Sequence, residues 1–153
     1  MQLYIMRHGD AVMQAPTDAQ RPLSDRGRKQ VAAMARHFLP LLPTRVLVSP
    51  YIRAQQTAAI LCESLVLNGG QLRHADFITP DGDPFQVVQE LEPYSSDVLL
   101  MVSHQPLVGT LLSLLLDGAL TGDYMMGTAS LACMELDHIG VGQARLKWLR
   151  HAV

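Results

Sequence analysis

The stretch Leu3-Tyr4-Ile5-Met6-Arg7-His8-Gly9-Asp10 joins a short apolar run to a cation, an imidazole and a glycine. An apolar run of this length is typical of a strand buried inside a sheet. In an open α/β sheet, residues at the carboxyl end of a central strand face the crevice in which ligands bind. The stretch therefore predicts a central strand that presents Arg7 and His8 to a functional site.

The composition is that of a folded chain with one core. The 153 residues have the length of one domain, and we expect residues 1–153 to form a single one. Apolar residues make up 48% of the chain, which is enough for a sizeable core. The net charge is −2 and basic residues form no runs, so the sequence carries no electrostatic footprint for nucleic acid or an anionic membrane.

Three features predict a cytoplasmic location. The longest apolar run, residues 107–116, is shorter than the about 20 residues that a bilayer span requires. The first predicted strand begins at Gln2, so we expect no signal peptide. Cys62 and Cys133 form no metal-type pair and are expected to be free buried thiols in a reducing compartment.

Apolar runs alternate with helical patterns along the rest of the chain. Ser24 and Asp83 have the character of helix N-caps, and Pro106 lies where the first turn of another helix would begin. The alternation of strands and helices predicts an α/β fold: a three-layer α/β/α sandwich around a mostly parallel sheet, without a lid subdomain. After the first strand, further strands are expected over residues 45–49, 72–78 (a weak edge strand), 97–103, 128–136 and 143–149.

Four residues that suit a phosphoryl group follow predicted strands. Arg7 and His8 follow the first strand, Arg53 lies in the first turn after the second, and His104 follows the strand over 97–103. Because the carboxyl ends of parallel strands share one edge of a sheet, we expect these side chains to converge in one pocket. Two guanidiniums and two imidazoles suit an anion of about two negative charges that accepts bidentate hydrogen bonds.

Three motifs resemble those of a known family. Arg7-His8-Gly9 is the first, Ser49-Pro50-Tyr51-Ile52-Arg53-Ala54-Gln55-Gln56-Thr57-Ala58 the second, and Val102-Ser103-His104 the third. Their order and spacing resemble the histidine phosphatase superfamily, the phosphoglycerate mutase-like proteins. The small size of the chain, Met6-Arg7-His8-Gly9-Asp10 and Arg21-Pro22-Leu23 are most similar to the bacterial SixA-type phosphohistidine phosphatases.

The resemblance implies a two-step mechanism that needs no metal and no cofactor. His8 attacks phosphorus as a neutral imidazole, while the backbone carbonyl of Gly9 holds its other ring nitrogen. Arg7, Arg53 and His104 are implied to hold the phosphate oxygens during in-line transfer. Water then cleaves the phospho-His8 intermediate.

Two further residues are candidates for binding. Gln105 begins the segment after His104, where free helix amides add donors for an anion, and we count it among the phosphate-binding residues. Arg21 lies on the loop after the first strand, and two roles are open for it: contact with phosphate or partner, and an ion pair with Asp18. The remaining histidines lie in polar or terminal settings and are expected at the surface: His37, His74, His138 and His151.

The substrate prediction rests on a missing acid and a missing lid. Asp10, Asp18, Asp81 and Glu90 are possible general acids, none of them compelling, and Asp83 is better explained as a helix cap. Phosphohistidine needs an acid least, because imidazole leaves far more readily than an alkoxide. An open site also admits a histidine on the surface of another protein. We therefore predict a phosphohistidine phosphatase acting on a signalling or phosphotransfer protein, such as a histidine phosphotransfer domain or a phosphocarrier.

Three alternatives stay open from the residues alone. A small-molecule phosphomonoesterase of the same superfamily would carry the same motifs. A metal-dependent hydrolase could be built on His8, Asp10 and His104. A non-catalytic phosphate-binding module is the third, and the intact His8 argues against it.

Overall fold

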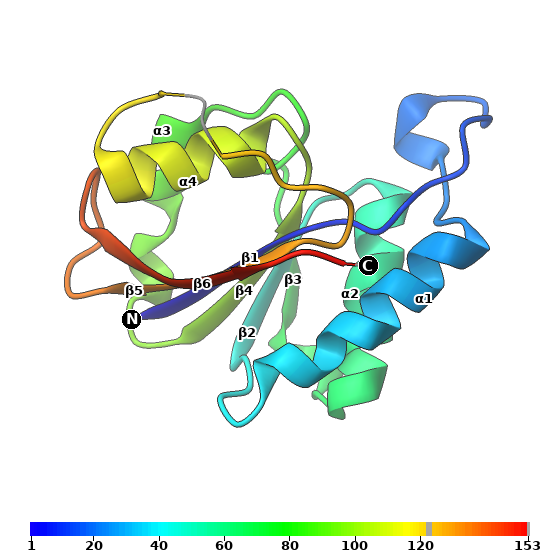
Figure 1. Ribbon diagram of the computed structural model, residues 1–153, viewed down its shortest axis with the longest axis horizontal. Helices are drawn as coiled ribbons and strands as arrows, with labels where there is room; N and C mark the ends of the chain where they lie inside the picture. The colour runs from blue at the N-terminus through cyan, green and yellow to red at the C-terminus, as the bar shows by residue number, and fades with distance from the viewer. Residues whose placement is uncertain (122–123, 153) are drawn as a thin grey trace.

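The computed structural model describes residues 1–121 and 124–152, which form a six-stranded sheet with helices on both faces (Figure 1). The strand order is β3-β2-β4-β1-β5-β6. The strands are β1 (Gln2–Arg7), β2 (Arg45–Val48), β3 (Leu72–His74), β4 (Val98–Ser103), β5 (Leu131–Leu136) and β6 (Ala144–Arg150). The α-helices are α1 (Asp25–Met34), α2 (Ile52–Leu65), α3 (Pro84–Glu90) and α4 (Leu107–Asp117), and the short 3₁₀ helices are η1 (Asp18–Gln20), η2 (Ala35–Phe38), η3 (Gly69–Gln71) and η4 (Glu92–Tyr94).

The sheet is parallel on one side of β1 and antiparallel on the other. β1 pairs with β4, β4 with β2 and β2 with β3, all in parallel. β5 runs antiparallel to β1, and β6 closes the sheet as the second strand of a hairpin. This arrangement confirms the predicted α/β class and the mostly parallel sheet.

Alternate residues of the central strands build a core on each face of the sheet. Leu3 and Ile5 of β1 belong to the core that includes α3 and α4. Tyr4 and Met6, which point the other way, belong to the core that includes α1 and α2. Figure 1 shows these helix pairs on opposite sides of the sheet, which confirms the predicted three layers. Among the helices described, none is long and apolar enough to cross a membrane.

Three local predictions need correction. The strand predicted over 72–78 ends at His74, because its pairing with β2 stops where β2 itself ends. The strand predicted over 128–136 begins only at Leu131, since Ala129 has a φ of +59° and donates its N–H to the His8 carbonyl oxygen (2.9 Å). Cys62 is half-buried rather than buried, whereas Cys133 is buried, and both thiols are free.

α1 begins directly against the end of β1. Ser24 caps the helix as predicted: its hydroxyl accepts from the Gly27 N–H (3.0 Å) and donates to the Asp10 carboxylate (2.6 Å). Two glycines allow this close approach. A Cβ on Gly27 would overlap the Asp10 carbonyl oxygen, and one on Gly9 would lie 2.8 Å from the Gly27 carbonyl oxygen. The start of α1 therefore holds the segment that follows His8.

Replacing Gly27 by alanine should force α1 away from the end of β1, because the new methyl group overlaps the Asp10 backbone. Overpacking of this kind costs about 1–3 kcal/mol, which lowers the melting temperature of a domain of this size by about 2–10 °C. Thermal unfolding followed by circular dichroism measures the change. Gly69→Ala is the control, because its Cβ would meet nothing within 4 Å. Equal melting temperatures for the two variants would contradict the close packing.

Candidate active site

The ends of three adjacent parallel strands assemble the site. β2, β4 and β1 lie side by side and lead into Ser49, His104 and His8. The register of β1 on β4 pairs Arg7 with Ser103, and the His8 N–H donates to the Ser103 carbonyl oxygen (3.0 Å). The two imidazoles therefore leave neighbouring strands at the same level, with ring centroids 5.0 Å apart. Their convergence was predicted.

α2 contributes Arg53 from its first turn, as expected. The side chain is 6% exposed, and its Nε donates to Nε2 of His8 (3.2 Å). One turn later, the Thr57 hydroxyl donates to the Arg53 carbonyl oxygen (2.8 Å) and accepts from the Gly9 N–H (3.1 Å). The second motif thus forms hydrogen bonds with two successive residues of the first. Arg53 bonds to the ring of His8, and Thr57 bonds to the backbone of Gly9.

The hydrogen bonds of His8 select one tautomer of its ring. Nδ1 lies 2.7 Å from the Gly9 carbonyl oxygen, which only accepts, so Nδ1 carries the proton. The guanidinium of Arg53 only donates, so Nε2 presents its lone pair. The contact with Gly9 that the family resemblance implied is present.

Burial and nearby cations keep His8 neutral. Burial lowers the pKa of His8 to about 4; the bond to Gly9 raises it, and the charges of Arg53, Arg7 and Arg21 lower it. The charged form is disfavoured because it would lose hydration and lie among guanidiniums. Nε2 is therefore uncharged at neutral pH and presents its lone pair next to groups that attract an anion.

Two buried nitrogens of the site have no hydrogen-bond partner among the described residues. One is Nδ1 of His104, whose Nε2 lies 2.7 Å from the Ser49 hydroxyl. The other is Nε of Arg7, whose NH1 group donates to the Met126 carbonyl oxygen (2.9 Å). Burial lowers the pKa of His104 to about 3. Because buried polar atoms are normally paired, these two nitrogens mark positions at which a ligand would bond.

Asp18 connects the first loop to Arg53. Its carbonyl oxygen accepts from NH1 of Arg53 (2.6 Å), and its carboxylate accepts from NH2 (3.1 Å). The carboxylate also accepts from Arg21 (3.0 Å), whose Nε donates to the Val12 carbonyl oxygen (2.8 Å). Slight burial raises the pKa of Asp18, but its bonds to Arg53 and Arg21 outweigh this and hold the pKa below its usual value. The ion pair is present, and contact of Arg21 with a substrate stays a prediction.

The other candidate residues take structural partners. Gln105 precedes α4 and accepts from the Gly109 N–H in the first turn of that helix through Oε1 (2.8 Å), so its role in binding phosphate stays a prediction. Asp83 caps α3 by accepting from the Phe85 N–H (3.0 Å). In the part of the chain that the structure describes, no group of three His, Cys, Asp or Glu side chains is placed to hold a metal ion. The metal-site alternative therefore lacks a ligand set there.

Comparison with known proteins identifies the family. Residues 3–76 match the sequence model of the histidine phosphatase superfamily (branch 1). Phosphohistidine phosphatase SixA of Escherichia coli (strain K12) is 35% identical over 147 residues, which cover 93% of this chain and 89% of that protein. The chain belongs to the histidine phosphatase superfamily.

Two further comparisons agree with this result. A SixA homolog from Haemophilus influenzae is 34% identical over 124 residues, covering 74% of this chain and 76% of that protein. The structure of the protein histidine phosphatase SixA complexed with tungstate superposes with a TM-score of 0.89 at 33% identity, covering 99% of this chain and 97% of that one. The fold and the family predicted from the motifs are thereby confirmed.

The second motif of this superfamily member contains a contact that the sequence analysis missed. The ring of Tyr51 packs edge-on against His104, with centroids 4.8 Å apart. The guanidinium carbon of Arg53 lies 5.0 Å from the centroid of the same ring. Tyr51 therefore packs against two residues of the site at once. Its place between Ser49-Pro50 and Arg53 is the signal that could have found it.

In the free protein, His8 should remain neutral until the pH falls to about 4, since its lowered pKa moves protonation to more acidic conditions. An NMR titration of the ring nitrogens measures this pKa. A peptide of residues 3–12 is the matched reference, and its His8 should have a pKa of about 6.5, the ordinary value for histidine. A His8 pKa near that reference value in the folded protein would contradict the described environment.

Replacing Asp18 by asparagine should loosen Arg53 and Arg21 together, because one carboxylate bonds to both. Since Asp18 is solvent-exposed, we expect kcat/KM for phosphoramidate to fall by about threefold to tenfold, with only a small decrease in the melting temperature. Asp76→Asn is the control, because Asp76 is also exposed and its carboxylate lies outside the site. If Asp18→Asn turns over phosphoramidate as fast as this control does, Asp18 does not position the arginines.

Proposed function

We propose that this protein removes phosphate from a phosphorylated histidine on a signalling or phosphotransfer protein, such as a histidine phosphotransfer domain or a phosphocarrier. The observation that carries the proposal is the lone pair on Nε2 of His8, held next to Arg53 by the bond between Nδ1 and Gly9. Identity of 35% to phosphohistidine phosphatase SixA, over 93% of the chain, supports the substrate class. His8, Arg7, Arg53 and His104 are the proposed catalytic residues, and no metal or cofactor takes part.

In the first step, Nε2 of His8 attacks phosphorus in line with the bond that breaks. The new Nε2–P bond forms and the P–N bond to the substrate breaks. The substrate imidazole leaves as a neutral ring, because the phosphorylated ring already carries a proton near neutral pH. Arg53 exchanges its bond to Nε2 for a bond to a phosphate oxygen, so the guanidinium stays with the transferred group.

The donors around His8 stabilise the charge on the equatorial oxygens. Nε of Arg7 and Nδ1 of His104 are buried and unpaired within the described residues. When the Ser49 hydroxyl donates to Nε2 of His104, the ring proton of His104 lies on Nδ1, where it can be donated to phosphate. Preorganised donors of this kind stabilise a transition state without reorganising.

In the second step, water attacks phospho-His8. The new O–P bond forms and the Nε2–P bond breaks. The phosphorylated ring carries its proton on Nδ1, and this proton stays there, hydrogen-bonded to Gly9. The water protons leave with the product as dihydrogen phosphate, so the neutral imidazole is regenerated without a net proton transfer to the protein.

The surroundings of the site suit a protein substrate. Within the described chain, the segments after β1, β2 and β4 lead into a loop or a helix and add no lid. A phosphohistidine on the surface of a folded partner can therefore approach the strand ends. Its imidazole leaves without help from a carboxylic acid, and neither His8 nor His104 forms a hydrogen bond to a described carboxylate. We propose a cytoplasmic location, with neither nucleic acid nor membrane as a partner.

His8→Ala should abolish phosphate release from a ³²P-labelled histidine phosphotransfer domain, a loss of more than about a thousandfold, because the attacking atom is gone. His74→Ala removes an exposed histidine on β3 and should keep full activity. Filter binding of the labelled protein measures the release. Full activity of His8→Ala would disprove the proposed nucleophile.

The same assay separates this function from its alternatives. The protein should release phosphate from phosphohistidine proteins faster than from sugar phosphates or nucleoside monophosphates. A preference of several orders of magnitude for such esters would select the small-molecule phosphomonoesterase. Activity should persist in EDTA, whereas a loss that added metal restores would select a metal-dependent hydrolase.

A further inference from the structure

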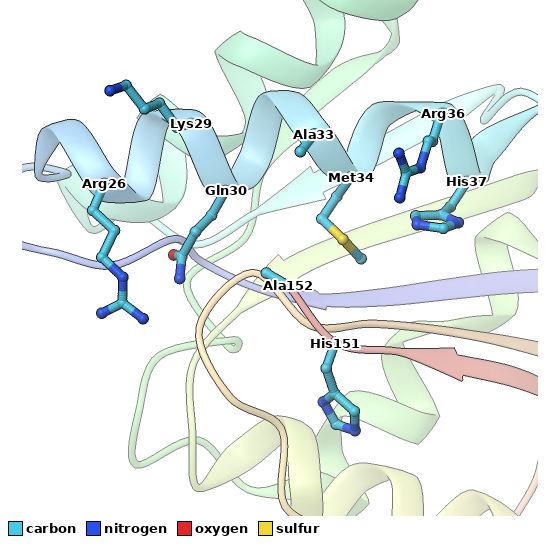
Figure 2. A pocket seen from close by; sticks show the side chains of 9 residues that line it. All are labelled: Arg26, Lys29, Gln30, Ala33, Met34, Arg36, His37, His151 and Ala152. Carbon is cyan, nitrogen blue, oxygen red and sulfur yellow. The ribbon is translucent and has the colours of Figure 1, made fainter.

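A pocket of about 570 Å³ lies outside the catalytic residues, between α1 and the chain end that follows β6 (Figure 2). Residues from Arg26 to His37 line one side, and His151 and Ala152 line the other. We call this pocket the α1 groove. Its volume is within the range of about 300–1,000 Å³ that is typical of ligand sites.

The α1 groove gathers positive charge in a chain whose net charge is −2. Arg26, Lys29 and Arg36 line it, together with the imidazoles of His37 and His151. None of the 14 Asp and Glu residues of the chain is among the described lining residues. Burial lowers the pKa of His37, and the charge of Arg36 lowers it further. The groove therefore suits an anionic ligand.

The arrangement of the lining residues favours an extended ligand. Arg26 and Arg36 are ten positions apart, which corresponds to about 15 Å along a helix. Figure 2 shows Met34 pointing from α1 toward Ala152, so an apolar wall lies between the two cations. An extended peptide rises about 3.3 Å per residue, so about five residues span the distance. A segment with carboxylates at both ends and an apolar residue between them matches this pattern.

The end of the groove that Arg26 and Gln30 line lies next to the segment that follows His8. Oε1 of Gln30 accepts from the Asp10 N–H (2.9 Å). NH1 of Arg26 lies 3.8 Å from the carboxylate of the same residue. Asp10 is two positions after His8, so this end of the groove lies within a few residues of the proposed nucleophile.

The opposite side of the groove is joined to the same site. Nδ1 of His151 lies 2.9 Å from the Ser130 hydroxyl oxygen. The carbonyl oxygen of Ser130 accepts from the N–H of Arg7 (3.1 Å), the residue before His8. A protein interface covers about 800 Å² on each partner, so a protein bound at His8 can also cover a groove this near.

We propose that the α1 groove binds an acidic segment of the phosphoprotein substrate, an inference that rests on the proposed function. Carboxylates of the segment pair with Arg26 and Arg36, and an apolar side chain packs on Met34 and Ala152. The groove then selects among phosphohistidine proteins by affinity, without changing the chemistry at His8.

Direct binding tests the groove without any phosphate transfer. The probes are fluorescein-labelled peptides that hold either Glu-Glu-Leu-Glu-Glu or Gln-Gln-Leu-Gln-Gln and carry no phosphohistidine. Anisotropy at low ionic strength should show binding of the acidic peptide to the full chain and little binding of the neutral one. Arg36→Glu should weaken binding of the acidic peptide by about tenfold or more, because attraction between Arg36 and the peptide carboxylates becomes repulsion. Arg28→Glu makes the same charge change at an exposed position of α1 outside the lining residues and should keep most of the affinity.

Turnover then tests the link to the substrate. A phosphohistidine peptide with the acidic segment should have a higher kcat/KM than its glutamine counterpart, through a lower KM. Arg36→Glu should remove this difference and leave turnover of phosphoramidate unchanged, which keeps the result separate from a failure of the catalytic site. Equal binding of the two labelled peptides, equal effects of Arg28→Glu and Arg36→Glu, or binding of inorganic tripolyphosphate without binding of the acidic peptide would overturn the proposal.

Discussion

The hydrogen bond between Nδ1 of His8 and the Gly9 carbonyl oxygen is the constraint on which the site depends. It places the ring proton on the nitrogen that faces the backbone, so the other nitrogen keeps its lone pair for phosphorus. Gly9 is itself held from two directions. Thr57 of α2 accepts from its N–H, and Gly27 of α1 approaches its Cα so closely that no side chain fits. Both helices on this face of the sheet therefore position the His8 ring through one residue, Gly9.

The positive charges around this ring keep it neutral in the unliganded protein and also suit the binding of a phosphoryl group. Guanidiniums next to a buried imidazole make its protonation unfavourable, and they attract the phosphoryl group that we propose the neutral imidazole attacks. A buried cation without a partner is unfavourable, however, and Arg53 lies almost fully inside. Asp18 reaches it from the first loop and shares its carboxylate with Arg21. The loop thus supplies the counter-charge that the strand ends lack.

The convergence of the proposed catalytic residues was predictable because each lies next to the end of a local element. Arg7 ends an apolar strand and His8 follows it, His104 follows another strand, and Arg53 lies in the first turn of the helix after Ser49-Pro50. Strand ends on one edge of a parallel sheet meet whatever the details of packing. The contacts of Tyr51 and the second partner of Asp18 were not predictable in this way, since each depends on how a loop or ring is seated against a distant element.

The sequence by itself therefore determined the α/β class, the family and the residues that converge at the strand ends, because short-range patterns of apolar and polar residues carry that information. Only the tertiary structure decided the lowered pKa of His8, since it follows from burial and from charges that come from separate helices and loops. The same holds for the α1 groove. Its cations lie in one helical segment of a chain of net negative charge, but the groove exists only because the fold brings His151 and Ala152 to the opposite side of that segment.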